Sequence, residues 1–168
     1  MSNTSVAIPL DVLATTPATL RALLRGLPAE ITSAAADEGW SPHDVVAHLA
    51  SLDPLTLVGR VRAIVEQDQP ALPAIDEHDV LERSALRGQP LGDVLDELTR
   101  TRTAALAWLG DLPPELLGRT GQHAEIGLLS AAEIIHHKAW HDLLHVQQVC
   151  RMLSLPIDAA SGGMRQFH

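Results

Sequence analysis

Four long segments of the chain carry apolar residues at helical spacing, and no segment shows the strict alternation that predicts a strand. These segments are residues 10–27, 41–66, 91–109 and 130–153. Four helices of this length predict a single all-α domain spanning residues 1–168 and folded as a four-helix bundle. In the third segment we expect an apolar inner side and a solvated outer side that carries Asp96, Glu97, Arg100 and Arg102.

Capping sequences mark the start of two of these helices. Ser41 is followed by Pro42 at the first helical position and by Asp44 at the third, which predicts a capping box. Ser130 stands three residues before Glu133 in the same relation. Both starts are therefore predicted to within about one residue.

Prolines predict breaks or ends in the helical segments. Asp53-Pro54 predicts a kink or restart inside residues 41–66, and Thr16-Pro17 predicts a kink or a late start in the first segment. Pro156 predicts that the last helix ends near residue 153.

The remaining segments are expected to be ends or connections. Residues 1–9 are expected to fray, and the small-residue tail 158–168 to be mobile or loosely docked. Short helices are expected near residues 29–38 and 79–86, and loops over 67–74 and 115–129. Because the connections 67–90 and 110–129 are long, they allow a crossover topology instead of simple alternation.

Composition supports a helical core and excludes some functions. Apolar residues make up 46% of the chain and aromatic residues only 2%, so the core must consist mainly of Leu, Ala, Val and Ile. With 12 basic and 21 acidic residues the formal charge is −9, which argues against binding nucleic acid. Trp40, Trp108 and Trp140 are expected to fill core positions, with the wall of a pocket as the alternative.

The sequence also predicts a cellular location. The single cysteine, Cys150, cannot form an intramolecular disulfide, which fits a reducing cytoplasm, and we expect it to be a buried, inert thiol. The first five residues have no basic character, so no signal peptide is expected. No run approaches about 18 consecutive apolar residues, so we expect no membrane span.

Histidines concentrate in the last helical segment. His137, His141 and His145 follow one another at intervals of four, which places them in one stripe on a helix. Two imidazoles four residues apart can bind one metal ion, whereas three in a row cannot easily converge on one point. We therefore expect two of the three to be ligands and a further ligand to come from a distant segment.

His48 is the best candidate for that distant ligand. It is the only other histidine inside a long, well-capped apolar helix. If the second and fourth helices face each other, His48 meets His141 and His145, and three imidazoles with an open fourth position are typical of a catalytic metal site. Asp44, one turn before His48, is a capping residue that could also orient its ring.

Two motifs at this separation resemble the DinB-like superfamily, which includes the DinB/YfiT-type metalloenzymes. The first runs from Trp40-Ser41 through Asp44 to His48-Leu49, and the second is His141-Asp142-x-x-His145-x-Gln147-Gln148. The resemblance implies a four-helix bundle with a His48, His141 and His145 triad that binds a divalent metal, zinc or nickel. Family members often carry an acidic residue where this chain has Trp140, which leaves open what tunes the ligands.

The resemblance implies two kinds of enzyme. One is a metal-dependent hydrolase of small molecules, and the other is a transferase or isomerase that uses a low-molecular-weight thiol. It also implies a homodimer. The alternative from another class is a metal-binding bundle without turnover, such as a stress-associated binding protein. His137 is expected to be a fourth ligand, a residue close to the ligands, or simply polar, and Arg165, Gln166 and His168 are candidates to cover the site.

Two other histidine motifs fit less well. An HD-domain phosphohydrolase needs a further upstream histidine and a later aspartate, at spacings that are absent here. The zincin motif HExxH needs a glutamate where this chain has Asp142, and a third ligand downstream. Neither class explains His48.

Overall fold

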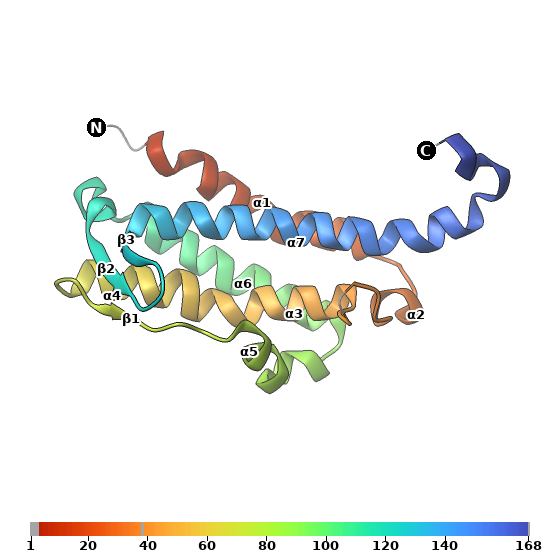
Figure 1. Ribbon diagram of the computed structural model, residues 1–168, viewed down its shortest axis with the longest axis horizontal. Helices are drawn as coiled ribbons and strands as arrows, with labels where there is room; N and C mark the ends of the chain where they lie inside the picture. The colour runs from red at the N-terminus through yellow and green to blue at the C-terminus, as the bar shows by residue number, and fades with distance from the viewer. Residues whose placement is uncertain (1–3, 38, 168) are drawn as a thin grey trace.

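The computed structural model describes residues 4–37 and 39–167, and they form a four-helix bundle, as predicted (Figure 1). Helix α3 continues through the π-helix η1 into α4 and so forms one long rod. The bundle helices are α1 (Thr4–Leu24), α3 (Pro42–Leu52) with η1 (Asp53–Gly59) and α4 (Arg60–Glu66), α6 (Leu91–Gly110) and α7 (Ala131–Ala160). The connections contain α2 (Ala29–Thr32), α5 (Glu77–Arg83) and the 3₁₀ turns η2 (Ala85–Gly88), η3 (Pro114–Gly118) and η4 (Gly162–Phe167).

The bundle has the crossover topology that the long second connection allows. Helices α1 and α7 run side by side in the same direction, and the α3 rod and α6 run together in the opposite direction (Figure 1). The segment from Gln67 to Pro90 returns along the outside of the bundle and carries α5 across the face of α3. This crossover is what brings the charged residues of α5 close to the middle of the bundle.

A small sheet closes one end of the bundle, and the sequence did not predict it. Strands β1 (Ala71–Leu72), β2 (Thr120–His123) and β3 (Gly127–Ser130) pair in that order, β1 parallel to β2 and β2 antiparallel to β3. The expectation that residues 67–74 and 115–129 are only loops is therefore wrong. The strands are two to four residues long, too short to show a period of two.

Three expected helix boundaries are also wrong. Helix α1 begins by Thr4 and includes Pro9 and Pro17, and Val6 is buried, so the part of residues 1–9 that the structure describes does not fray. Helix α7 continues through Pro156, and Met152 and Leu153 near its end pack in the core. Helix α2 covers only four of the residues expected at 29–38.

The helix interior tolerates Pro17 because another group satisfies the carbonyl that it leaves free. Proline has no N–H, so the Leu13 carbonyl one turn earlier loses its helical partner. Arg102 Nη1 donates to that carbonyl oxygen at 2.9 Å. Asp53-Pro54 shows a different solution, because there the helix continues as the π-helix η1, which fits the predicted kink or restart.

The apolar core is divided into two clusters by a layer of buried polar side chains. One cluster contains Leu57 and Ile135, and the other contains Leu49 and Val149. Each long helix contributes a polar residue to the layer between them, and these residues are Thr16, His48, Asp53, Arg102, Lys138 and Asp142. Burying polar groups costs free energy unless they are paired. Proteins accept this cost mainly at functional sites, so a functional site is expected in this layer.

Helix α1 is also long and apolar enough to cross a membrane by length and composition, over Val6–Leu24 with a mean hydropathy of 1.2. This segment includes Asp11 and Arg21 and is not an uninterrupted apolar run, so the expectation of no membrane span stays a prediction. Core helices of globular bundles share this composition, and Leu13, Leu20 and Leu24 are buried against the rest of the bundle.

The predicted capping boxes are confirmed, and one of them gives a stability prediction. The Ser41 hydroxyl accepts from the Asp44 N–H at 3.1 Å, and Asp44 Oδ2 accepts from the Ser41 N–H at 3.0 Å. Ser41→Ala should lower the free energy of unfolding by about 1 kcal/mol. Urea denaturation of the variant would measure this, with exposed Ser33→Ala as the control, and a loss equal to that of the control would contradict it.

Candidate metal centre

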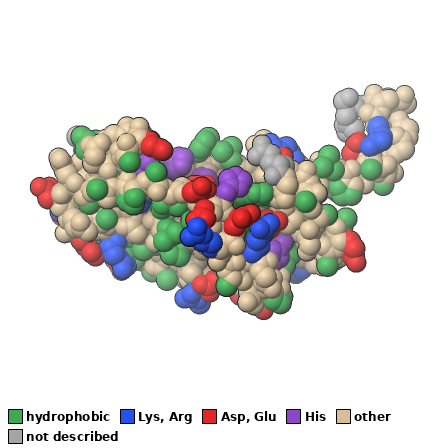
Figure 2. Space-filling model, turned by 60° about the horizontal axis from the view of Figure 1, so that its bottom comes forward, with side chains coloured by type: hydrophobic (Ala, Val, Ile, Leu, Met, Phe, Trp, Pro, Cys, Tyr) green, Lys and Arg blue, Asp and Glu red, His purple; other side chains and the backbone are tan. Residues whose placement is uncertain are grey.

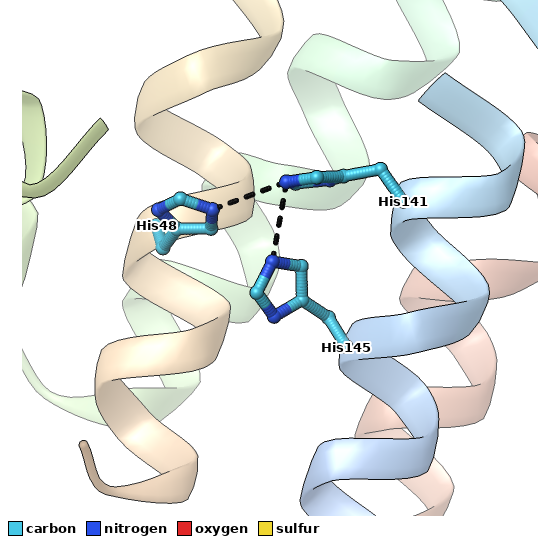
Figure 3. A group of neighbouring side chains, drawn as sticks. All are labelled: His48, His141 and His145. Carbon is cyan, nitrogen blue, oxygen red and sulfur yellow. Dashed lines mark hydrogen bonds between the residues drawn. The ribbon is translucent and has the colours of Figure 1, made fainter. Parts of the chain in front are cut away.

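The three predicted ligands meet in the middle of the bundle. His48 comes from α3, and His141 and His145 come from successive turns of α7 (Figure 3). The Nε2 atom of His141 lies 3.4 Å from Nε2 of His48 and 3.2 Å from Nε2 of His145. One nitrogen from each of the three rings lies within 4.8 Å of the others, so the three can hold one ion.

These separations fit a tetrahedral metal ion. Zinc–nitrogen bonds of about 2.0–2.1 Å place two ligand nitrogens of a tetrahedral site about 3.3–3.4 Å apart. The two Nε2–Nε2 distances of 3.2 and 3.4 Å are close to this value. Neutral imidazole nitrogens that point their lone pairs at one another need a cation or a proton between them. Metal binding by the triad stays a prediction, and the donor set and its spacing favour it.

Neighbouring groups fix the orientation of two rings. Gln148 Oε1 lies 2.8 Å from His145 Nδ1, so a proton on Nδ1 donates to the amide and Nε2 is free to bind an ion. Trp40 stacks parallel to His145 with ring centres 6.0 Å apart, and it meets His48 edge-on at 4.7 Å. Trp40 is thus a wall of the site. His48 Nδ1 is buried and has no hydrogen-bond partner among the residues described.

Burial keeps two of the rings uncharged. Burial is the main cause that lowers the pKa of His48 from 6.5 to about 3, and the charges of His145 and His141 act in the same direction. Burial likewise lowers the pKa of His145 from 6.5 to about 4. Both imidazoles are therefore neutral at pH 7, which is the form that binds metal.

A carboxylate that the sequence did not single out faces the triad. Glu77 lies in the first turn of α5, and its Oε2 atom is 3.5 Å from Nε2 of both His48 and His141. The neighbouring His141 ring is the main cause that lowers the pKa of Glu77 to about 2, so Glu77 is ionised. The sequence of residues 75–90 indicates only a charged connection with a short helix. No pattern within these residues predicts that the crossover places α5 against α3.

An ion-pair network lies directly behind the triad in the polar layer. Arg102 donates to Asp53 at 2.7 Å and to Asp142 at 2.6 Å, and Lys138 Nζ lies 3.1 Å from Asp53. All four side chains are at most 5% exposed, and their two positive and two negative charges balance. The expectation that Arg102 lies outside the bundle is wrong, because its charge is neutralised by acids from α7 and η1.

The network is joined to the triad through α7. Asp142 follows His141 in the chain, and Lys138 Nζ lies 3.4 Å from His141 Nδ1. The network therefore fixes the part of α7 that carries His141 and His145. Asp142 is buried and pairs with Arg102 and Lys138. It is therefore not available as a catalytic carboxylate of the zincin type.

Several other candidates lie away from the ligand nitrogens. Asp44 caps α3 and pairs with Arg87 at 2.9 Å, so it does not orient His48. His137 lies on the exposed side of α7, with its ring centre 6.3 Å from that of His141. Trp140, expected in the core, is 55% exposed, and Trp108 is half-buried beside the core.

The chain end and the cysteine also differ from expectation. Cys150 is exposed, because five residues after His145 a helix side chain points to another face. Arg165 pairs with Asp158 at 2.8 Å near the far end of the chain, so it does not cover the triad, and Gln166 is exposed (Figure 1). His168 lies outside the described residues.

Two hollows flank the triad and share Glu77. The larger is a cavity of about 280 Å³ that reaches His141, and it is lined by Thr56, Arg60, Glu77, Ile126, Leu129, Glu133, Ile134, His137, Lys138 and His141. The smaller is about 190 Å³ and is lined by Trp40, His48, Glu77, His78, His145 and Gln148. Figure 2 shows histidine side chains reaching the surface beside acidic ones on this face. The triad is thus accessible to a small molecule.

The low pKa values of His48 and His145 predict acid sensitivity of the metal-free protein. In the unfolded chain both rings bind protons below about pH 6.5. In the folded chain His145 does so only near pH 4 and His48 only near pH 3. The unfolded chain thus binds more protons in this interval, so the free energy of unfolding decreases as the pH falls from 6.5. The slope is at most about 1.4 kcal/mol per pH unit for each ring.

Urea denaturation at pH values from 7 down to 5 measures this slope. His145→Gln should flatten the slope, and His136→Gln, an exposed residue on the same helix, should not. A wild-type protein equally stable at pH 7 and pH 5 would contradict the prediction.

A crossover four-helix bundle with three convergent histidines defines a class of fold and site, and sequence comparison gives its family. The profile of the DinB superfamily matches residues 13–149, so the chain belongs to this superfamily, as the two histidine motifs predicted. Among curated proteins, none matches the chain in sequence.

A solved structure has the same fold. YfiT from Bacillus subtilis, described as "a probable metal-dependent hydrolase with an unusual four-helix bundle topology", is similar to this chain with a TM-score of 0.80. The match covers 90% of this chain and 87% of YfiT at 19% identity, which establishes the shared fold.

Proposed function

We propose that this protein is a metal-dependent hydrolase of small molecules, with His48, His141 and His145 as the ligands of one divalent ion. The observation that carries the proposal is the open cavity of about 280 Å³ that ends at His141, beside the ionised carboxylate of Glu77. A metal-binding bundle without turnover needs no such cavity. The description of YfiT and the shared fold support the same class.

The residues present fit a catalytic metal site. Three imidazole ligands would leave the charge of a divalent ion uncompensated, and such an ion acts as a Lewis acid and activates water at neutral pH. Zinc and nickel both suit imidazole ligands. Gln148 and the buried network behind α7 hold the rings in place, so the ligand geometry is preorganised.

Glu77 has the position of a proton acceptor in this site. Its Oε2 is equally distant, at 3.5 Å, from the coordinating atoms of His48 and His141, on the side shared by both hollows. A carboxylate in this position can take a proton from a water molecule that attacks a substrate and return it to the leaving group.

Turnover assays with metal-free and reconstituted protein test the proposal. Untagged protein loaded with zinc or nickel should hydrolyse members of a panel of chromogenic esters and amides, and metal-free protein should not. Glu77→Gln should keep its metal and lose about 10²–10⁴-fold in rate. Glu82→Gln, exposed on the same helix, is the matched control.

Two outcomes would contradict the hydrolase. If turnover does not depend on metal, the triad is not the reaction centre. If metal-loaded protein reacts with electrophiles only when a low-molecular-weight thiol is added, the protein is a thiol transferase.

We also propose that the protein is cytoplasmic and forms a homodimer, as the family resemblance and the single cysteine suggested. The exposed apolar residues Trp140, Leu143 and Leu144 on α7 support a partner surface. Light scattering on the purified protein should give twice the mass of the 18.0 kDa chain, and a monomer would contradict the dimer.

A further inference from the structure

Arg60 is a positive charge on the wall of the larger cavity that is paired with no carboxylate in the described part of the chain. It begins α4, directly after the π-helix, on the same wall as Thr56. Its Nη2 atom donates to the Pro73 carbonyl at 3.1 Å, and its Nε atom is buried without a hydrogen-bond partner among residues 4–37 and 39–167. A guanidinium stays charged in proteins, so this charge needs an anion or water.

The second contact of Arg60 does not satisfy it. Nη2 also lies 3.3 Å from His123 Nε2. The Glu125 N–H donates to Nδ1 of the same ring at 3.2 Å, and a neutral histidine has only one acceptor nitrogen. Both contacts cannot be hydrogen bonds at once, so the Pro73 carbonyl is the one secure acceptor of Arg60.

The other cations and anions of the cavity are engaged elsewhere. Lys138 is neutralised by Asp53 and Asp142, and Glu133 is held in the capping box with Ser130. Glu77 faces the triad. Among the described residues that line the cavity, Arg60 is therefore the cation without an ion-paired carboxylate, although the charge of Glu77 acts on it, and His141 marks the reactive end.

The rest of the cavity wall is mainly apolar and small. Ile126, Leu129 and Ile134 line it, and the volume of about 280 Å³ lies near the lower end of the about 300–1,000 Å³ typical of ligand sites. For comparison, a cavity of about 150 Å³ holds benzene. A ring or a short alkyl chain with one charged group thus fits.

We propose that Arg60 binds the carboxylate of the substrate, and that the substrates of this enzyme are small apolar molecules with a carboxylate at one end and the reactive bond at the other. The Nη atoms of a guanidinium can donate to the oxygens of a carboxylate, and Arg60 lies on the cavity wall. A monoanion is favoured over a dianionic phosphate because Glu77 and Glu133 line the same cavity. The inference rests on the proposed function for the reactive end, and on Arg60 alone for the charged end.

Calorimetric titration with octanoate and octanamide, which differ only in the charged group, tests the inference. Metal-free wild-type protein should bind octanoate at least about tenfold more tightly than octanamide, since a hydrogen bond to a charged group has about that effect. Arg60→Gln should abolish the preference and Arg60→Lys should retain part of it. Arg62→Gln is the control, because Arg62 is exposed on the same helix and stacks on Trp108.

The design separates this inference from the metal chemistry. Metal-free protein is used so that the carboxylate cannot be bound by an ion, and the melting temperature of each variant verifies that it folds. Equal affinity of wild type and Arg60→Gln for octanoate would overturn the inference, as would equal affinity of wild type for the two ligands or no saturable binding of octanoate. None of these results bears on the proposed metal-dependent hydrolysis. That proposal is tested separately, by comparing the turnover of metal-free and reconstituted protein.

Discussion

Replacing Arg102 with methionine should lower the free energy of unfolding by about 3–5 kcal/mol, the range for removing one partner of a buried ion pair. The side chain is 1% exposed and binds Asp53, Asp142 and the Leu13 carbonyl. Without it two buried carboxylates share only Lys138, and the carbonyl freed by Pro17 loses its donor. For a chain of this size the melting temperature should fall by about 6–20 °C.

The control for Arg102 lies two residues away. Arg100 pairs with Glu97 at 2.7 Å, is 69% exposed and belongs to the same helix, so Arg100→Met should change stability by less than about 0.5 kcal/mol. Thermal melting monitored by circular dichroism compares the two variants. If they are equally stable, the buried network does not hold the bundle together.

Replacing His141 with alanine should weaken the binding of zinc by well over about 100-fold, because loss of groups that merely support the ligands already costs about 10–100-fold. His141 is central because its Nε2 lies within 3.4 Å of the Nε2 atoms of both other ligands. His137→Ala, one turn earlier on the same helix, should bind zinc like the wild type. Competition against a chromogenic chelator measures both constants.

A specific result would contradict this ligand assignment. If His137→Ala lost as much affinity as His141→Ala, the binding pair on α7 would be His137 and His141. The far-ultraviolet circular dichroism of each variant provides the folding control, since both positions lie inside a continuous helix.

The sequence predicted the parts of the fold and site that depend on local spacing. The capping residues Ser41 and Ser130 marked helix starts because their side chains bond within three residues. The interval of four residues between His141 and His145 likewise predicted that both side chains lie on the same face of a helix. His48 was found because few histidines lie in an apolar, capped helix.

Features that depend on contacts between distant segments were not predictable in this way. Arg102 looked like a surface residue because its partners Asp53 and Asp142 are 49 and 40 positions away. Glu77 reaches the triad only because the chain crosses over before α6. The sequence predicts a kink or late start at Pro17 because the donor that replaces its missing N–H comes from another helix.

Trp140 stands where family members often carry an acidic residue. Trp140 is 55% exposed and does not contact the ligands, so it does not take the place of an acidic residue that tunes them. Here the groups beside the ligands are Gln148, which fixes His145, and Glu77, which faces His48 and His141. If the triad binds a metal ion as proposed, the groups placed to tune its ligands lie on α5 and on the next turn of α7.

The central claim is that His48, His141 and His145 bind one divalent metal ion. Elemental analysis of untagged protein, combined with X-ray absorption at the edge of the metal found, tests it most directly. The account predicts one zinc or nickel ion per chain, with about three histidine nitrogens at about 2.0–2.1 Å for zinc. Protein that neither contains nor takes up a stoichiometric metal ion, or an ion without histidine in its coordination shell, would contradict it.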